Sequence, residues 1–192
     1  MQVSVQSDKE LIRSYISGQE SALEFLITRH KDKVYTSILF LVKEQSLAED
    51  IFQDAFIKVI DTLRTGKYKE EGKFLPWVMR ISYNLCIDHF RRQKRTPVIT
   101  NSEGFDIFNV LTFADGNVED DIIADQTRTK VRSLIDNLPS EQREVVILRH
   151  YSDLSFKEIA ELTGVSINTA LGRMRYALIN MRKMITEKNI PM

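Results

Sequence analysis

Helical periodicity runs through most of the chain and is interrupted once. In residues 9–93, apolar side chains recur at helical spacing almost throughout, and the same pattern resumes near Glu119. Residues 97–118, between these stretches, lose the pattern and carry a proline and two glycines. With seven glycines and four prolines in 192 residues, the sequence favours helices over strands and turns. We therefore predict an all-α protein of two small helical domains, residues 1–96 and 119–192, joined by an irregular linker over residues 97–118.

The second predicted domain carries a helix-turn-helix pattern. Ser155 and Glu158 form a capping box at the start of one helix, and Gly164 ends that helix because glycine readily takes the left-handed conformation of a sharp turn. Ser166 then caps a second helix. Its apolar side chains fall on one stripe at 100° per residue, which we expect to face the core: Ile167, Ala170, Leu171, Met174, Ala177, Leu178, Met181 and Ile185. Two further helices, the later one capped at Ser140, complete a predicted four-helix domain.

The polar side of that second helix suits DNA. Short polar side chains come first, a glycine then permits close approach, and arginines follow, which together fit base edges and phosphates. A solvated helix face would also be polar, but the capping box and the glycine turn in the same segment favour contact with a major groove. The candidate residues are Ser166, Asn168, Thr169, Gly172, Arg173, Arg175 and Tyr176.

An acidic stripe that contains one isoleucine marks a helix of the first domain. Ser46 and Glu49 predict another capping box, followed by a helix over residues 48–63. One face of this helix is apolar, and the other aligns Asp50, Gln53, Asp54, Ile57 and Asp61. A partner with a basic and partly apolar surface would use the whole stripe. The residues alone are equally compatible with Ile57 being an ordinary exposed apolar side chain.

A helix over residues 76–93 combines an aromatic ring with cationic and amide side chains. One of its faces carries Trp77, Arg80, Asn84, Asp88 and Arg91. Because bases stack on aromatic rings and amides read base edges, this face suits unpaired nucleic acid. A basic run that begins with Arg91 and Arg92, and a charged loop around Tyr68, extend the candidate surface. Trp77 is equally well explained as a core residue, and both explanations hold if one edge of its ring is exposed.

Charge is distributed unevenly, although its sum is zero. Residues 1–95, 96–137 and 138–192 carry net charges of +3, −5 and +2. Such weakly basic ends imply little nonspecific affinity for DNA, because that affinity grows with the number of phosphates neutralised.

Several classes of protein find no support in the sequence. No apolar run approaches the roughly 18 residues of a membrane span, and the charged N-terminus has no signal-peptide core, so we expect a cytoplasmic protein. The single cysteine, Cys86, fits a reducing compartment, and its proximity to His89 is better explained by packing than by a metal site. Phosphate loops, nucleophile elbows and carboxylate pairs are missing, and we predict no enzyme activity, catalytic residue, metal or cofactor.

Three segments together resemble the extracytoplasmic-function (ECF) group of bacterial RNA polymerase sigma factors. The segment AEDIFQDAFIKV (residues 48–59) is similar to the helix with which that family binds core polymerase. The segment FLPWVMRISYNLCIDHFRR (residues 74–92) is similar to the family's promoter-melting, −10-reading helix. Residues 138–175, which begin LPSEQREV, resemble its −35-reading domain. The segments occur in the family's order and spacing and cover most of the chain.

The resemblance implies a sigma factor that acts as a monomer on core RNA polymerase and directs transcription initiation at specific promoters. Residues 1–96 would bind polymerase and the −10 element, and residues 119–192 the −35 element. The clamp helices of the polymerase's largest subunit would be contacted by Asp50, Gln53, Asp54 and Ile57. The unpaired −10 strand, from which a base is flipped into a pocket, would be held by Tyr68, Trp77, Arg80, Asn84, Asp88, Arg91 and Arg92. The seven residues named on the helix-turn-helix would lie in the −35 major groove.

The resemblance also implies an anti-sigma factor, which in this family is often anchored in a membrane, while the chain itself does not insert into one. The alternative to a sigma factor is a dimeric one-component regulator, in which the helix-turn-helix is joined to a ligand-sensing N-terminal domain. Such a regulator predicts a dimer and a ligand pocket. Residues 9–95 do not resemble a sensor, and this alternative leaves the acidic stripe and the Trp77 helix unexplained.

Overall fold

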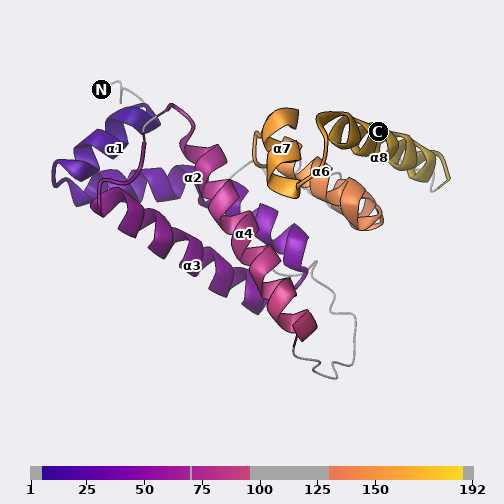
Figure 1. The fold of residues 1–192 in the computed structure, drawn as a ribbon, viewed down its shortest axis with the longest axis horizontal. Coiled ribbons are helices and arrows are strands. Elements are labelled where there is room, and N and C mark those ends of the chain that lie inside the picture. The colour runs from indigo at the N-terminus through magenta and orange to yellow at the C-terminus, as the bar shows by residue number, and fades with distance from the viewer. Residues whose placement is uncertain (1–5, 70, 96–129, 188–192) are drawn as a thin grey trace, which may run out of the picture. The chain divides into compact units, whose positions relative to one another are not determined.

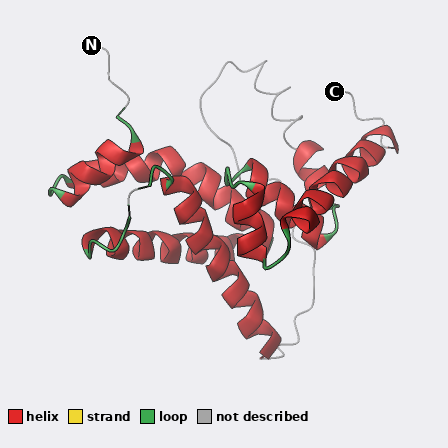
Figure 2. Ribbon diagram, turned by 45° about the horizontal axis from the view of Figure 1, so that its top comes forward, coloured by secondary structure: helices red, strands yellow, loops and turns green. Residues whose placement is uncertain are grey.

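The computed structural model describes residues 6–69, 71–95 and 130–187, and all regular structure in these ranges is helical (Figure 1, Figure 2). The helices form two compact units. This confirms the predicted all-α fold with two helical domains. The predicted linker, residues 97–118, lies outside the described residues, as do both boundaries predicted for it.

Four helices build the first unit. They are α1 (Asp8–Ile16), α2 (Glu20–Val42), α3 (Gln45–Arg64) and α4 (Phe74–Arg95). Helix α2 packs against the other three, and α3 and α4 also pack against each other (Figure 1). The centre of the core is formed by side chains with no exposed surface, among them Leu26, Val34, Ile38, Val59 and Val78. Burial of such apolar side chains is the main stabilising contribution to a helical unit of this kind.

A two-residue connection joins α2 to α3. Lys43 adopts a left-handed conformation, with φ of 59°, and its N–H donates to the carbonyl of Leu39 at 2.8 Å, which closes α2. The extended residue Glu44 then leads into α3. Connections this short make consecutive helices antiparallel neighbours. The ring of Phe52 on α3 accordingly meets the ring of Tyr35 on α2, with centroids 5.9 Å apart.

Three helix starts differ from the sequence prediction. Helix α4 begins at Phe74, two residues before the predicted start at residue 76. Helix α3 begins at Gln45 with Glu44 as its cap residue, and the hydroxyl of Ser46 donates to the carboxylate of Glu44 at 3.1 Å instead of accepting a backbone N–H. Helix α6 begins at Ser140, because the N–H of Arg143 donates to the carbonyl of Pro139 at 2.9 Å. The predicted caps at Ser46 and Ser140 are therefore wrong: both serines already have helical backbone conformation, which a cap residue does not.

The second unit contains a helix over residues 130–136, followed by α6 (Ser140–His150), α7 (Phe156–Thr163) and α8 (Ile167–Glu187). Helices α6, α7 and α8 each pack against the other two. Their core includes Leu134, Leu138, Val145, Leu148 and Ile159, all nearly or fully buried. This is the predicted four-helix domain, although residues 119–129 of its predicted first helix lie outside the described residues.

Helix α8 packs with a different face from the one that its apolar stripe predicts. Ala170 and Ala177 are fully buried, whereas Ile167, Leu171 and Leu178 keep 44–46% of their surface exposed. The prediction that these three side chains face the core is wrong. Polar contacts to α6 explain the difference, because Arg173 and Asn180 turn their side of α8 toward that helix. The small side chains of Ala170 and Ala177, on the same side of α8, then allow the two helices to approach closely.

Candidate functional site

The helix-turn-helix forms as the sequence predicts. The hydroxyl of Ser155 accepts the N–H of Glu158 at 3.3 Å, and the Glu158 carboxylate accepts the N–H of Ser155 at 2.9 Å. Gly164 ends α7 with a φ of 69°, a left-handed conformation that glycine adopts without steric cost. The hydroxyl of Ser166 accepts the N–H of Thr169 at 3.0 Å and so caps α8. Each of these local interactions was encoded within a few residues of sequence, which is why they could be predicted.

The first turns of α8 present an exposed polar surface. Asn168, Thr169 and Arg175 are exposed, and Tyr176 keeps 60% of its surface in solvent. No atom lies within 4 Å of the position that a Cβ would take at Gly172. Because glycine leaves this space empty, the helix backbone can approach a ligand closely here. The exposed N–H groups at a helix N-terminus also favour phosphate oxygens. This surface therefore combines groups for base edges with groups for the DNA backbone.

Arg173 differs from the other residues predicted on this surface. Its guanidinium lies 3.7 Å from the carboxylate of Glu144 on α6, and its side chain is only 25% exposed. Next to this pair, the Asn180 amide donates to the side-chain oxygen of Gln142 at 2.8 Å. Arg173 thus lies at the flank of the candidate surface and joins α8 to α6, while Arg175 extends into solvent.

The acidic stripe of the first unit lies on one exposed face of α3. Asp50, Gln53 and Asp54 are exposed, and Ile57 keeps 56% of its surface in solvent. The opposite face of α3 buries six side chains in the core: Ala48, Ile51, Ala55, Phe56, Val59 and Leu63. Within the described residues, neither Asp50 nor Asp54 has an ion-pair partner. The face therefore presents uncompensated carboxylates around one apolar side chain.

An aromatic cluster lies where the loop before α4 meets that helix. The rings of Tyr68 and Trp77 have centroids 4.5 Å apart, and Phe74 lies beneath both, at 6.2 Å from Tyr68 and 5.9 Å from Trp77. Trp77 is half-buried, so one part of its ring packs on the core and another part reaches solvent. Trp77 therefore packs as a core residue while part of its ring stays exposed, and its predicted contact with nucleic acid stays a prediction.

Cationic and polar side chains continue this surface along α4. The exposed residues Arg80, Asn84 and Asp88 follow Trp77 at helical spacing, and Arg91 and Arg92 are exposed beyond them. The carboxylate of Asp88 lies 3.6 Å from the guanidinium of Arg91, so it neutralises part of the positive charge at this end. The seven residues predicted from Tyr68 to Arg92 are thus all exposed or half-exposed. Phe74, which supports the aromatic cluster and is 2% exposed, was not predicted from the sequence.

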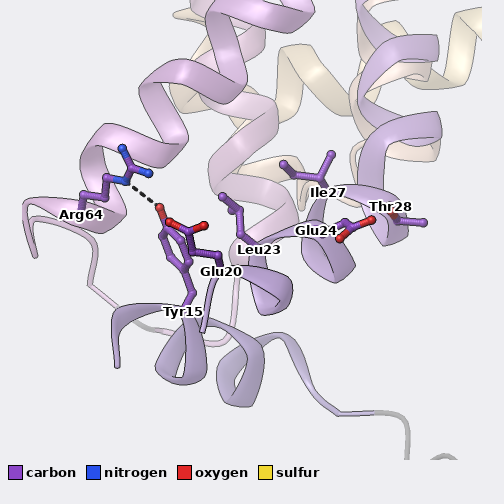
Figure 3. Close-up of a pocket in the computed structure, with 7 residues that line it drawn as sticks. All are labelled: Tyr15, Glu20, Leu23, Glu24, Ile27, Thr28 and Arg64. Atoms are coloured by element: carbon purple, nitrogen blue, oxygen red, sulfur yellow. Dashed lines mark hydrogen bonds between the residues drawn. The ribbon is translucent and has the colours of Figure 1, made fainter. Parts of the chain in front are cut away.

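One surface pocket lies away from all the predicted site residues. It has a volume of about 330 Å³ and is lined by Tyr15, Glu20, Leu23, Glu24, Ile27, Thr28 and Arg64 (Figure 3). At one end of it, Arg64 Nε donates to the hydroxyl of Tyr15 at 2.9 Å. The lining mixes carboxylates, one guanidinium and apolar side chains.

Three observations bear on metal binding and membrane insertion. Cys86 is fully buried, and burial raises the pKa of its thiol from 9.0 to about 12. Among the described residues, no three His, Cys, Asp or Glu side chains gather closely enough to hold a metal ion. Each helix that the structure describes is too short or too polar to cross a membrane.

Two sequence-family models match the chain. Sigma-70 region 2 matches residues 26–96, and Sigma-70, region 4 matches residues 128–175. The chain is 30% identical over 164 residues to the RNA polymerase sigma factor SigV of Bacillus subtilis, which spans 85% of this chain and 91% of SigV. It is 27% identical over 184 residues to the ECF RNA polymerase sigma factor SigW of the same organism, across 93% of this chain and 97% of SigW.

Two solved structures are similar to this chain. One is CnrH in complex with the cytosolic domain of CnrY, with a TM-score of 0.61 and 20% identity over 95% of this chain and 99% of CnrH. The other is the sigma factor RpoE of Bartonella quintana in complex with the anti-sigma factor NepR, with a TM-score of 0.62 and 16% identity over 85% of this chain and 96% of RpoE. At these identities the likeness establishes a shared helical fold.

Proposed function

The chain belongs to the extracytoplasmic-function (ECF) group of RNA polymerase sigma factors, and from this we propose that it binds core RNA polymerase and directs transcription initiation at specific promoters through −10 and −35 contacts. The observation that carries this proposal is the exposed face of α3. Ile57 is 56% exposed and lies in one stripe with carboxylates, and a basic and partly apolar partner surface would pair with the carboxylates and bury the isoleucine together.

We assign this face to the clamp helices of the polymerase's largest subunit. Asp50 and Asp54 supply charge, Gln53 supplies hydrogen bonds, and Ile57 supplies apolar surface at the centre. Complementary charge of this kind accelerates association and fixes the orientation of a partner more than it raises affinity. Burial of the isoleucine would supply the apolar contribution to affinity.

The aromatic cluster and the polar face of α4 are assigned to the unpaired non-template strand at the −10 element. Tyr68 and Trp77 offer stacking surfaces for a flipped base, and Arg80 and Asn84 offer hydrogen bonds to the base edge or to phosphate. Arg91 and Arg92 would bind backbone phosphates. Asp88, which lies beside Arg91, would hold that guanidinium in place and not contact DNA itself.

The first turns of α8 are assigned to the −35 major groove. Asn168, Thr169 and Arg175 supply groups for base edges, while Ser166 and the helix N-terminus suit a phosphate. Gly172 allows the helix to approach the groove, and Tyr176 borders it. Arg173 would act mainly by holding α8 on α6, because Glu144 already engages its guanidinium.

The remaining partners follow from the same assignment. An anti-sigma factor that covers the α3, α4 and α8 surfaces would hold the protein inactive, and one of the similar structures is a sigma factor in complex with an anti-sigma factor. Sigma factors regulate transcription while the polymerase carries out the chemistry, so we infer that the chain has no enzyme activity of its own and needs no cofactor. We infer that it acts in the cytoplasm, as a monomer on core polymerase.

Charge reversal on α3 tests the proposal. Purified protein is mixed with core RNA polymerase and co-elution is measured for the wild type, for Asp54→Arg and for Asp32→Arg, a control at an exposed carboxylate of α2. We expect the wild type and the control to co-elute with polymerase and Asp54→Arg to elute separately. Failure of the wild type to co-elute, together with an elution volume of a dimer, would instead support the one-component regulator.

A further inference from the structure

His30 is a buried histidine to which the proposed contacts give no role. It lies on α2, is 9% exposed, and its Nε2 is 2.8 Å from Oδ2 of Asp8 on α1. A carboxylate can only accept, so Nε2 carries the hydrogen and donates it. The second oxygen of Asp8 accepts from Arg29 Nη1 at 2.6 Å, and Arg29 Nη2 donates to the carbonyl of Gln6 at 2.7 Å. Both oxygens of Asp8 are thus used to attach α1 to α2.

The ring of His30 lies against the base of the aromatic cluster. Its centroid is 5.6 Å from the centroid of Phe74, the first residue of α4, which is 2% exposed. Phe74 in turn supports Tyr68 and Trp77. A continuous series of contacts therefore runs from the first turn of α1 through a buried histidine to the two rings that face solvent.

We propose that Asp8 and His30 are positioning residues for the Tyr68–Trp77 pair, and that through them α1 controls how well the protein holds an unpaired −10 base. This inference rests on the proposed function of the aromatic cluster and adds a role for α1, which lies outside the family-model match that begins at residue 26.

The chemistry of the contact explains why it would fix the rings. An imidazole whose nitrogen donates to a carboxylate cannot turn about its Cβ–Cγ bond without breaking that hydrogen bond. The contact between two aromatic rings depends on their relative orientation, so a fixed imidazole also fixes the contact with Phe74. Without the hydrogen bond, His30 could reorient, and Phe74 would lose a fixed neighbour on one side. A base that stacks on Trp77 would then bind a less ordered platform and would lose affinity.

Trp77 makes the inference testable because it is the single tryptophan of the chain. Its fluorescence emission and its quenching by acrylamide report on the cluster in the full-length protein without any DNA. Promoter opening is then measured with holoenzyme. The promoter is a duplex that the wild-type holoenzyme has selected from a random-sequence pool, and 2-aminopurine in its −10 segment reports strand separation by its fluorescence.

The variants separate positioning from general stability. His30→Phe keeps an aromatic ring but removes the hydrogen bond, and Asp8→Ala removes the acceptor from a partly exposed site, which keeps the test available if the buried variant does not fold. The matched control, Tyr15→Phe, removes another polar contact of α1, its hydrogen bond from Arg64 (Figure 3). Tyr15 lies near the end of α1, whereas Asp8 is its first residue.

We expect His30→Phe and Asp8→Ala to shift Trp77 emission to longer wavelength, to increase its quenching, and to slow opening about tenfold, the size expected for partial loss of one base-stacking contact. Polymerase co-elution should not change, and Tyr15→Phe should behave as the wild type. The inference is overturned if both variants leave Trp77 emission and opening unchanged, or if Tyr15→Phe alters them equally.

A further variant separates failure of this inference from failure of the proposed function. If holoenzyme with Trp77→Ala opens the promoter as well as the wild type does, the assignment of the cluster to −10 DNA is wrong, and the inference falls with it. If Trp77→Ala is impaired while His30→Phe is not, the −10 assignment stands and only the positioning role is overturned.

Discussion

At the scale of single residues, Arg173 and Arg175 of α8 lie two positions apart and have different surroundings. Arg175 is exposed on the surface assigned to DNA, whereas Arg173 is 25% exposed and 3.7 Å from Glu144. A guanidinium with a protein partner must give up that contact before it can bind a base, and an exposed one has no such cost. The two residues should therefore contribute to different properties of the protein.

Alanine substitutions distinguish these contributions. Arg175→Ala should weaken holoenzyme binding to a −35 duplex by about 1–3 kcal/mol, the value of one good base contact, and leave urea unfolding unchanged. Arg173→Ala should lower the urea midpoint because it removes the ion pair with Glu144 that joins α8 to α6. Both quantities are measured on each variant, by fluorescence anisotropy and by circular dichroism. The reverse pattern would place Arg173, and not Arg175, in the groove.

Cys86 yields a second prediction at this scale. Burial raises the pKa of its thiol from 9.0 to about 12, so the fold favours the protonated thiol. The contribution to stability is fully present below pH 9.0 and is lost as the pH rises toward 12. Because the thiolate is the reactive form, the native protein should react with Ellman's reagent at neutral pH only as fast as it unfolds. Rapid labelling of the native protein would show that Cys86 is accessible.

At the scale of elements, the helix caps give a matched pair of substitutions. Ser155 caps α7 through its hydroxyl, whereas Ser46 lies within α3 and caps nothing. Ser155→Ala should cost about 1 kcal/mol and speed amide hydrogen exchange in α7 roughly fivefold. Ser46→Ala should leave exchange in α3 nearly unchanged, because alanine is a good helix former. Equal effects at the two sites would mean that Ser46 is a cap after all.

The same pair illustrates which elements the sequence could specify. A capping box and a left-handed glycine are local, so the α7–α8 turn was predicted with its residues in their observed roles. The start of α3 was misplaced although Ser46 and Glu49 have the spacing of a capping box, because a serine and a glutamate at this spacing can also lie inside a helix. The packing face of α8 was predicted wrongly because helical periodicity identifies the face richest in apolar side chains. In the structure, polar contacts from Arg173 and Asn180 to α6 set the rotation of the helix instead.

The candidate site likewise has one part that the sequence predicts and another that it does not. Exposed faces on α3, α4 and α8 follow from helical spacing, and the structure places their predicted residues on such faces. The support beneath them does not follow from spacing. Phe74 and His30 belong to different helices, and the contact of His30 with Asp8 joins residues 22 positions apart, so only the folded chain brings them together.

At the scale of the whole molecule, charge limits what the protein can do alone. The segment before residue 96 carries a net charge of +3 and the segment after residue 137 carries +2, while the stretch between them is acidic. Neutralisation of few phosphates gives weak binding and a shallow dependence on salt. Two weak DNA surfaces become effective when a partner holds them at a fixed separation, because the second contact then forms within one complex.

This predicts a large difference between the free protein and the holoenzyme. Fluorescence anisotropy with a labelled promoter duplex should detect weak binding by the free protein, with little preference over an unrelated duplex, and tight, selective binding once core polymerase is added. In the holoenzyme, Asn84→Ala and Arg175→Ala should each reduce affinity, and the double variant should lose about the sum of the two free energies, since the residues lie in different units. Tight and selective duplex binding by the free protein would contradict this account, because the affinity would then reside in one surface and the polymerase would not be needed to join the two.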